Sequence, residues 1–196
     1  TGSTATSASA PTRTRCDVVT SRRRPSRAKR QQQIVDVLET AFADLMEADP
    51  KAFRVKYRKM AADPFAFYRG SACLFYADVT GQEDPWADER TSRVWIHGDL
   101  HAENFGTYMS ASGHLVFNVN DFDEAYVGPF SWDLKRLAAS VSLIGYGKAL
   151  SDRVIGELVA RFATAYLTEL RAIAAGGDDA IGSITLDNAD GVLLQV

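Results

Sequence analysis

Several segments of the chain show the apolar spacing of amphipathic helices. Such helices are expected to begin near Gln31, to span about 51–62, to begin near Ser131 or Trp132, and to span about 151–175. Pro50 separates the first two, because the residue before a proline avoids the helical region. The pattern therefore predicts helices at both ends of the chain.

Two short apolar runs in the middle of the chain have the composition of buried strands. Val94-Trp95-Ile96 leads straight into the polar residues 97–99, and the run 115–119 leads into residues 120–123. Small polar residues supply a turn between the strands. An aromatic-rich segment at 65–76 precedes them, and aromatic residues at this density predict core positions. Helices, a β-hairpin region and helices again predict an α+β fold.

Charge divides the chain into two parts. The first 30 residues hold eight Lys or Arg against one acid, so their net charge is +7, and the remainder carries −10 because the whole chain carries −3. This composition predicts a disordered basic tail over 1–30 and one globular domain over 31–196. A solvated arm is favoured over nucleic-acid binding, with a docking arm or an organelle transit peptide as alternatives.

The apolar runs and the cysteines of the chain bear on the cellular compartment of the protein. No run of about 18 apolar residues occurs, so no membrane span is expected. Cys16 and Cys73 lie far apart and outside any disulfide or zinc pattern, which fits a reducing compartment. We therefore expect a cytoplasmic protein, and the oligomeric state is left open.

Two acid-bearing loops follow the predicted strands and carry the residue types that phosphoryl transfer requires. That reaction needs a carboxylate that orients and deprotonates the acceptor, and oxygen ligands that hold Mg²⁺ against the phosphates. Asp99 and Asn104 lie five positions apart, which is the spacing of the kinase catalytic loop. Asp121 lies 22 positions after Asp99 and is followed by Phe122. Asp123 adds a further carboxylate.

The same loops resemble those of known phosphotransferases. HGDLHAEN (97–104) is similar to the catalytic loop of the aminoglycoside and choline phosphotransferases, and VNDFDE (119–124) is similar to their metal-binding loop. A closer resemblance is to the family DUF2252, whose members look kinase-like. The shared motifs are PFAFYRG (64–70), GD (98–99) with NFG (104–106), NDFDE (120–124) and GPFSWDLKRL (128–137).

The resemblance implies a role for each site residue. The roles are Asp99 as the catalytic base; Asn104, Asp121 and Asp123 as Mg²⁺ ligands; His97, Gly98 and Asp133 as structural support of the site; and Arg69 as a contact to the phosphates of the cofactor. The implied fold is protein kinase-like, a helical catalytic lobe with embedded β-hairpins. The implied reaction moves a phosphoryl group from the nucleotide Mg-ATP to a hydroxyl or amine of a small-molecule acceptor.

One part of a kinase-like enzyme is missing ahead of the catalytic loop. Such an enzyme needs a glycine-rich loop over the phosphates and a strand lysine, yet residues 31–96 contain only Gly70 and Gly81. In DUF2252 proteins a glycine-rich stretch with a following lysine lies after the catalytic region, and the chain stops first. The resemblance therefore implies an incomplete domain, a fragment whose nucleotide-clamping lobe is largely missing.

Two other interpretations are open from the residues alone. A metal-dependent hydrolase would use His97, Asp99, His101, Asp121 and Asp123, because alternate residues of an extended segment point the same way and could converge on a metal. A pseudokinase-like module would keep the fold without turnover, and the missing glycine-rich loop favours it.

Three further polar residues, which have no assigned role in the reaction, are expected to be exposed to solvent. His101 has no role in a kinase-like site and is expected at the surface. Lys135 and Arg136 are expected on the solvated face of the helix that follows Pro129, with binding of an acidic group as the alternative.

Overall fold

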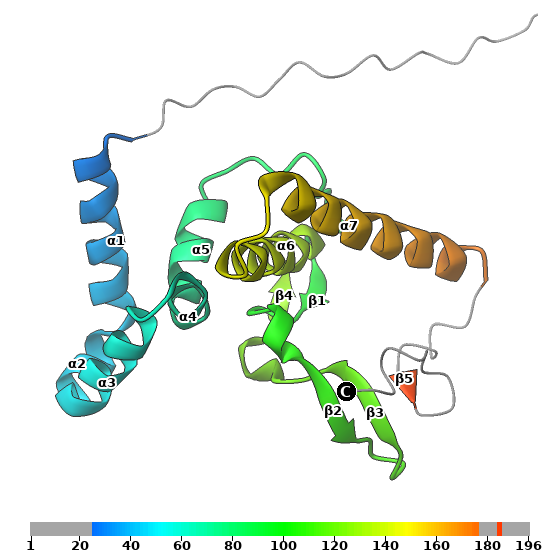
Figure 1. The fold of residues 1–196 in the computed structure, drawn as a ribbon, viewed down its shortest axis with the longest axis horizontal. Coiled ribbons are helices and arrows are strands. Elements are labelled where there is room, and N and C mark those ends of the chain that lie inside the picture. Colours follow the sequence, from blue (N-terminus) through cyan, green and yellow to red (C-terminus); the bar gives the residue numbers. More distant parts are fainter. Residues whose placement is uncertain (1–24, 177–183, 186–196) are drawn as a thin grey trace, which may run out of the picture.

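A computed structural model describes residues 25–176 and 184–185 of the chain, and its fold is α+β as predicted. Within the described part, Figure 1 shows helices before and after most of the strands, which form two small antiparallel sheets, with one last short strand after the final helix. The elements are α1 (Arg27–Ala41), α2 (Ala43–Ala48), α3 (Pro50–Met60), α4 (Pro64–Gly70), α5 (Ala72–Val79), β1 (Val94–Ile96), η1 (Ala102–Asn104), β2 (Phe105–Met109), β3 (Leu115–Val119), η2 (Phe122–Glu124), β4 (Tyr126–Gly128), α6 (Phe130–Gly147), α7 (Asp152–Ala174) and β5 (Ile184–Thr185).

The first helix begins inside the segment that the composition predicts to be disordered. Ser26 caps it by accepting a hydrogen bond from the backbone N–H of Lys29 at 3.4 Å. Arg30 then donates two hydrogen bonds to the carboxylate of Asp78 in α5, at 2.7 and 2.6 Å. The predicted tail boundary at residue 30 is therefore wrong for the last residues of that segment. Residues 1–24 lie outside the described part.

Two aspartate–proline pairs start helices as well as ending the preceding ones. Asp49 Oδ1 accepts hydrogen bonds from two backbone N–H groups of the first turn of α3, at 3.0 and 2.9 Å. Asp63 does the same for α4, at 2.8 and 2.9 Å. Each is followed by a proline, whose fixed φ and missing N–H suit the first helical position. The aromatic-rich segment thus folds as the helices α4 and α5.

The small sheets bring the two acid-bearing loops to one place. β1 pairs antiparallel with β4, with Val94 opposite Gly128, and the β2–β3 hairpin lies between them in sequence, with Phe105 opposite Val119. The predicted strands β1 and β3 occur as expected. β1 ends where the first loop starts, and β3 ends where the second loop starts. Phe105 directly follows the first loop and Val119 directly precedes the second, so their pairing brings the two loops together.

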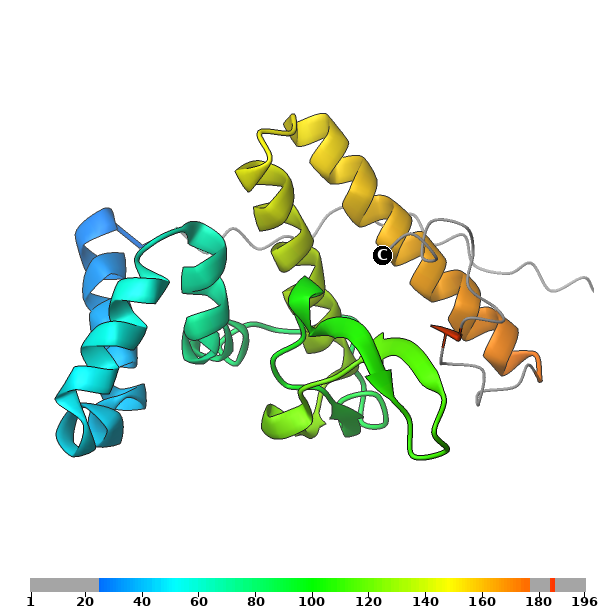
Figure 2. The same cartoon turned by 60° about the horizontal axis from the view of Figure 1, so that its bottom comes forward.

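Packing is divided between two groups of helices. Leu38, Met60 and Leu74 form a buried cluster among α1, α3 and α5. Figure 2 shows α6 between these N-terminal helices and the β2–β3 hairpin, with α7 folded back beside it. The two long helices approach closely at Gly145, where an added Cβ would lie 2.9 Å from Ile155 Cγ1.

Over the described ranges, none of the helices combines the length and hydropathy needed to cross a membrane.

Candidate active site

The two acid-bearing loops are bonded to each other. The backbone N–H of Asn120 donates to the carbonyl of Asn104 at 2.9 Å. The Nε2 of His97 lies 2.8 Å from the carbonyl oxygen of Asn120, and since a carbonyl only accepts, Nε2 carries the hydrogen. His97 Nδ1 then accepts from the backbone N–H of Asp99 at 3.3 Å. His97 therefore links both loops through its two ring nitrogens.

A close backbone approach requires glycine at the centre of the first loop. Gly98 has a φ of 87°, and a Cβ there would lie 2.0 Å from the backbone oxygen of Glu124. Any side chain would collide with the second loop, and an L-residue would also be strained at that φ. Asp121 is itself left-handed, with φ 65° and ψ 56°, a conformation that Asp and Asn tolerate better than most residues.

One face of α6 holds successive residues of the first loop. The carboxylate of Asp133 accepts from the backbone N–H of His97 at 2.6 Å and of Gly98 at 3.2 Å. Seven positions along, the Oγ of the fully buried Ser140 accepts from the N–H of Ala102 at 3.1 Å. Both α6 residues project from the same side of the helix because residues three, four and seven apart share a face. The loop is thereby fixed at several points.

Arg136, on the same face of α6, binds the predicted catalytic base. Its side chain has 0% exposed area, and its Nε donates to Asp99 Oδ1 at 2.6 Å, with Nη2 also pairing to that oxygen. Nη2 also donates to the backbone carbonyl of Tyr68 at 3.1 Å, and the Tyr68 hydroxyl donates to the backbone carbonyl of Arg136 at 3.0 Å. The guanidinium carbon lies 4.4 Å from the centroid of the Tyr68 ring. Burial raises the pKa of Tyr68 to about 12, which keeps that hydroxyl a donor.

The predicted solvated face is therefore wrong for Arg136. An arginine is buried only where its charge finds partners inside the protein, and here Asp99, a carbonyl and an aromatic face supply them for Nε, Nη2 and the guanidinium plane, while Nη1 has no hydrogen-bond partner among the described residues. A signal was present in the sequence: Arg136 follows Asp133 by three positions, so a helix that turns Asp133 towards the loop turns Arg136 towards it as well.

Burial raises the pKa of Asp99, and the neighbouring Arg136 opposes that rise. The side chain of Asp99 retains 22% exposure. The carboxylate is thus held by one oxygen at the guanidinium, which leaves Oδ2 for another partner.

A cavity of about 690 Å³ opens between α3, α4 and the two loops. Its lining is Ala52, Val55, Lys56, Lys59, Met60, Ala66, Arg69, Gly70, Asp99, His101 and Asp121. Of the predicted site residues, Asp99, Asp121 and Arg69 line it together. Arg69 also forms an ion pair with Glu103, whose side chain lies outside the lining. Two carboxylates from different loops therefore face one small-molecule-sized space.

Two predicted metal ligands lie outside this lining. Asn104 is 2% exposed, and its Oδ1 accepts from the backbone N–H of His101 at 2.8 Å. A carbonyl oxygen has two lone pairs, so a ligand role for Asn104 needs only access from the cavity. Asp123 is exposed to solvent. Both ligand roles stay predictions.

The residue set of the hydrolase interpretation is not assembled. Within residues 25–176 and 184–185, no group of three or more His, Cys, Asp and Glu side chains is placed to hold a metal ion. The positive φ of Gly98 breaks the extended segment on which the expected convergence of His97, Asp99 and His101 depends. Both ring nitrogens of His97 are also engaged by backbone groups.

His101 is buried, contrary to the surface position expected for it. It is 3% exposed, its ring lies edge-on to Phe65 with centroids 6.1 Å apart, and its Nδ1 has no hydrogen-bond partner among the described residues. Burial, assisted by the positive charges of Arg69 and Arg136, lowers the pKa of His101 to about 4. The ring is therefore neutral at physiological pH and presents an apolar edge with one polar nitrogen.

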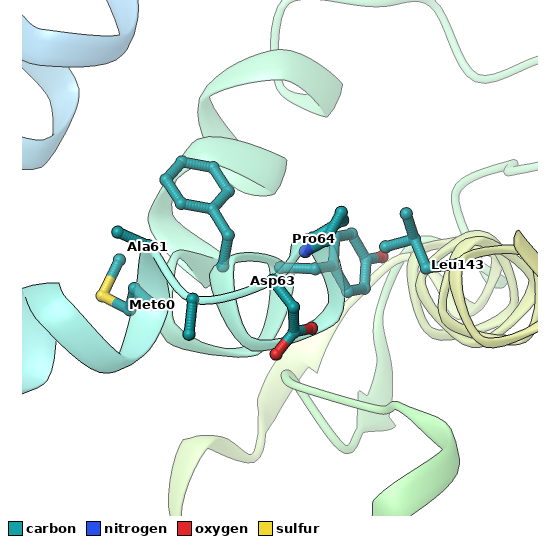
Figure 3. A pocket seen from close by; sticks show the side chains of 8 residues that line it. Met60, Ala61, Asp63, Pro64 and Leu143 are labelled. Atoms are coloured by element: carbon teal, nitrogen blue, oxygen red, sulfur yellow. The ribbon is translucent and has the colours of Figure 1, made fainter. Parts of the chain in front are cut away.

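A second hollow lies on the other side of α4 and has a different character. Figure 3 shows Met60, Ala61, Asp63, Pro64 and Leu143 around it, with Leu143 reaching in from α6. Its volume is about 560 Å³, and Asp63, its only acid, is engaged as the cap of α4. This hollow gathers no set of groups for chemistry, so the candidate site is the cavity beside Asp99.

The fold and site define an α+β protein in which two acid-bearing loops are hydrogen-bonded to each other and the first is held by a buried arginine. The chain belongs to the family described as "Uncharacterized protein conserved in bacteria (DUF2252)", whose model matches residues 48–191. This confirms the family resemblance that the loop motifs predict, and the match includes both loops and α6. No curated protein and no solved structure matches the chain at a significant level.

Proposed function

We propose that this protein is a kinase-like phosphotransferase in which the two loops act on one small-molecule acceptor. The observation that carries the proposal is that Asp99 and Asp121 line the same cavity. They come from loops that are hydrogen-bonded to each other and follow separate strands. Rigid placement of two carboxylates around one space is what positioning and charge stabilisation in phosphoryl transfer require.

Asp99 is the proposed base. The acceptor oxygen or nitrogen would form a bond to the γ-phosphorus of ATP while the bond from that phosphorus to the bridging oxygen breaks and ADP leaves. The acceptor's proton would pass to Asp99 Oδ2, since Arg136 engages Oδ1. Arg136 would keep Asp99 ionised against the opposing effect of burial.

Asp121 is the proposed contact to Mg²⁺. Its carboxylate lines the cavity, and within the described residues it takes part in no ion pair. Hard oxygen donors suit this ion, which is commonly held by one or two carboxylates together with substrate phosphates and water. Bound there, Mg²⁺ would neutralise charge on the transferring group, with Asn104 and Asp123 as the further proposed ligands.

The kinase-like architecture and the nucleotide clamp belong to the same proposal. The test is calorimetry of Mg²⁺-dependent ATP binding to this chain and to a chain extended beyond Val196, each with and without Asp121→Asn. Binding by the extended chain that is lost in the variant supports the proposal. Equal binding by both versions of the extended chain, or none by either, refutes it.

A non-catalytic, pseudokinase-like module is the second candidate. Two contacts favour it: Asp99 is engaged by a buried guanidinium, and the Asn104 amide oxygen is engaged by a backbone N–H. The two candidates differ in turnover. ATP binding without ADP formation across a panel of hydroxyl and amine acceptors would favour the module, and ADP formation that depends on Asp121 would exclude it.

A further inference from the structure

The cavity beside Asp99 has two oppositely charged walls. Asp99 and Asp121 form an acidic wall. Lys56, Lys59 and Arg69 form a wall that we call the basic wall. A hydroxyl or amine acceptor with no charge would need the acidic wall alone. Of the basic wall, the proposed reaction uses only Arg69, for the phosphates of the nucleotide, and it gives Lys56 and Lys59 no role.

Within the described residues, an internal ion pair accounts for Arg69 but not for the two lysines of the basic wall. In the described part of the chain, Lys56 and Lys59 form no ion pair, and Lys56 Nζ lies 4.8 Å from the ring centroid of Phe42. Arg69 pairs with Glu103, which lies outside the cavity lining. Like charges gathered around one hollow repel each other, and an anion bound between them would remove that cost.

Two of the three residues of the basic wall, Lys56 and Lys59, come from α3, and Arg69 comes from α4. Lys56 and Lys59 lie three positions apart on α3, so they share one face of the helix. The apolar residue Val55 lines the cavity beside them. Lys51 and Arg58 are also exposed on the same helix but do not line the cavity. The cavity therefore selects two of the exposed cations of α3, which distinguishes a site from a generally basic helix.

We infer that the acceptor is an anionic small molecule whose phosphate or carboxylate group lies against Lys56, Lys59 and Arg69. The opposite end of such a molecule would bring its hydroxyl or amine to Asp99 across the cavity. The volume of about 690 Å³ suits a small metabolite rather than a macromolecule. The identity of the reacting group rests on the proposed function, whereas binding of the anion rests on the basic wall alone.

The test is binding of inorganic phosphate and of glycerol 3-phosphate to the chain, measured by calorimetry at physiological ionic strength. The Lys56→Gln/Lys59→Gln double variant is expected to weaken binding of both probes by about tenfold, from the loss of two charge pairs. Lys51→Gln/Arg58→Gln is the matched control, because it removes the same charge from the same helix outside the cavity. It is expected to change binding by less than about twofold.

Equal weakening by the two double variants, or no binding of either probe, would overturn the inference. ATP serves as a competitor that separates the two sources of a phosphate. Displacement of glycerol 3-phosphate by ATP with the same lysine dependence would assign the basic wall to the donor and overturn its assignment to the acceptor. No displacement by ATP from the extended chain, under conditions in which that chain binds ATP, supports the assignment to the acceptor.

These measurements need no turnover, so the two proposals can fail separately. Lysine-dependent binding of the anion together with absence of phosphoryl transfer would refute the proposed function and leave the anion site standing. Transfer to a neutral acceptor, unaffected by Lys56→Gln/Lys59→Gln, would refute the anionic acceptor and leave the proposed function standing.

Discussion

Arg136 Nε lies 2.6 Å from Asp99 Oδ1, and this contact joins the wholly buried centre of α6 to the edge of the cavity. The two residues differ in their access to water, because Asp99 keeps 22% side-chain exposure and Arg136 keeps none. Removal of Arg136 and removal of Asp99 therefore have different consequences for the residue that is left. Without Arg136, the carboxylate can take water or a proton; without Asp99, a guanidinium remains buried with its charge unpaired.

This asymmetry predicts the ranking of two substitutions. Asp99→Ala is expected to lower the free energy of unfolding by about 3–5 kcal/mol, the usual cost of leaving a buried charge alone, and Arg136→Met by less. The Asp99→Ala/Arg136→Met double variant is expected to be more stable than the sum of the two losses implies, with a coupling of about 1–3 kcal/mol. Urea unfolding of the four proteins measures this cycle. Additive losses would show that the contact is not formed.

Asp121 offers a cleaner test of chemistry than Asp99 does. Asn adopts the left-handed conformation that Asp121 has as readily as Asp does, and no ion pair among the described residues is lost. Asp121→Asn is therefore expected to change the free energy of unfolding by less than about 0.5 kcal/mol while abolishing Mg²⁺-dependent nucleotide binding in the extended chain. Asp123→Asn removes a further proposed ligand that lies outside the cavity lining, so it is expected to weaken that binding only partly. A stable Asp121→Asn protein with full binding contradicts the assignment.

Gly98 and Gly113 form a matched pair for the close approach of the loops. Both have positive φ, 87° and 79°, but a Cβ at Gly98 would meet the Glu124 backbone oxygen at 2.0 Å, and one at Gly113 meets nothing within 4 Å. Gly113→Ala is expected to cost about 1 kcal/mol from backbone strain alone. Gly98→Ala is expected to cost clearly more and to displace one loop from the other. Thermal unfolding measures both, and equal losses would mean that the loops can separate freely.

Sequence patterns predict the parts of this fold that depend on local signals. The strands β1 and β3 are short, mostly apolar runs, and α6 and α7 have the regular apolar spacing of amphipathic helices, although no residue of α7 is buried. The strands β2 and β4 are not predicted, because each contains a glycine, Gly106 or Gly128, and forms only with its partner strand. The helices α4 and α5 escape prediction for another reason: dense aromatic residues hide their spacing.

The candidate site also has residues that the sequence predicts correctly and residues that it misplaces. Motif spacing brings attention to Asp99 and Asp121, and the structure places both at one cavity. The ordinary preference of charged and polar groups for water misplaces Arg136 and His101, because burial of each depends on partners from distant segments. Polar residues repeated on one face of a helix, as at Asp133, Arg136 and Ser140, are the signal that corrects such a prediction.

Buried neutral His101 predicts a pH dependence of stability. Its pKa in the folded protein is about 4, below the usual 6.5, because burial disfavours the charged ring. As the pH falls below about 6.5, the unfolded chain takes up a proton at this position that the folded chain does not, so stability is lost progressively until about pH 4. The expected loss from this one group is about 1–3 kcal/mol.

Unfolding in urea at pH 7.5 and at pH 4.5 measures this loss, and variants isolate the group responsible. His101→Gln removes the titrating ring, so the difference in stability between the two pH values is expected to shrink by about 1–3 kcal/mol relative to the unsubstituted protein. His114 is exposed and lies at the β2–β3 turn, so His114→Gln is the control and is expected to leave the difference unchanged. Carboxylates titrate in the same range but are common to all three proteins, so they cancel in the comparison. An unchanged difference in His101→Gln would place His101 in water and remove it from the cavity wall.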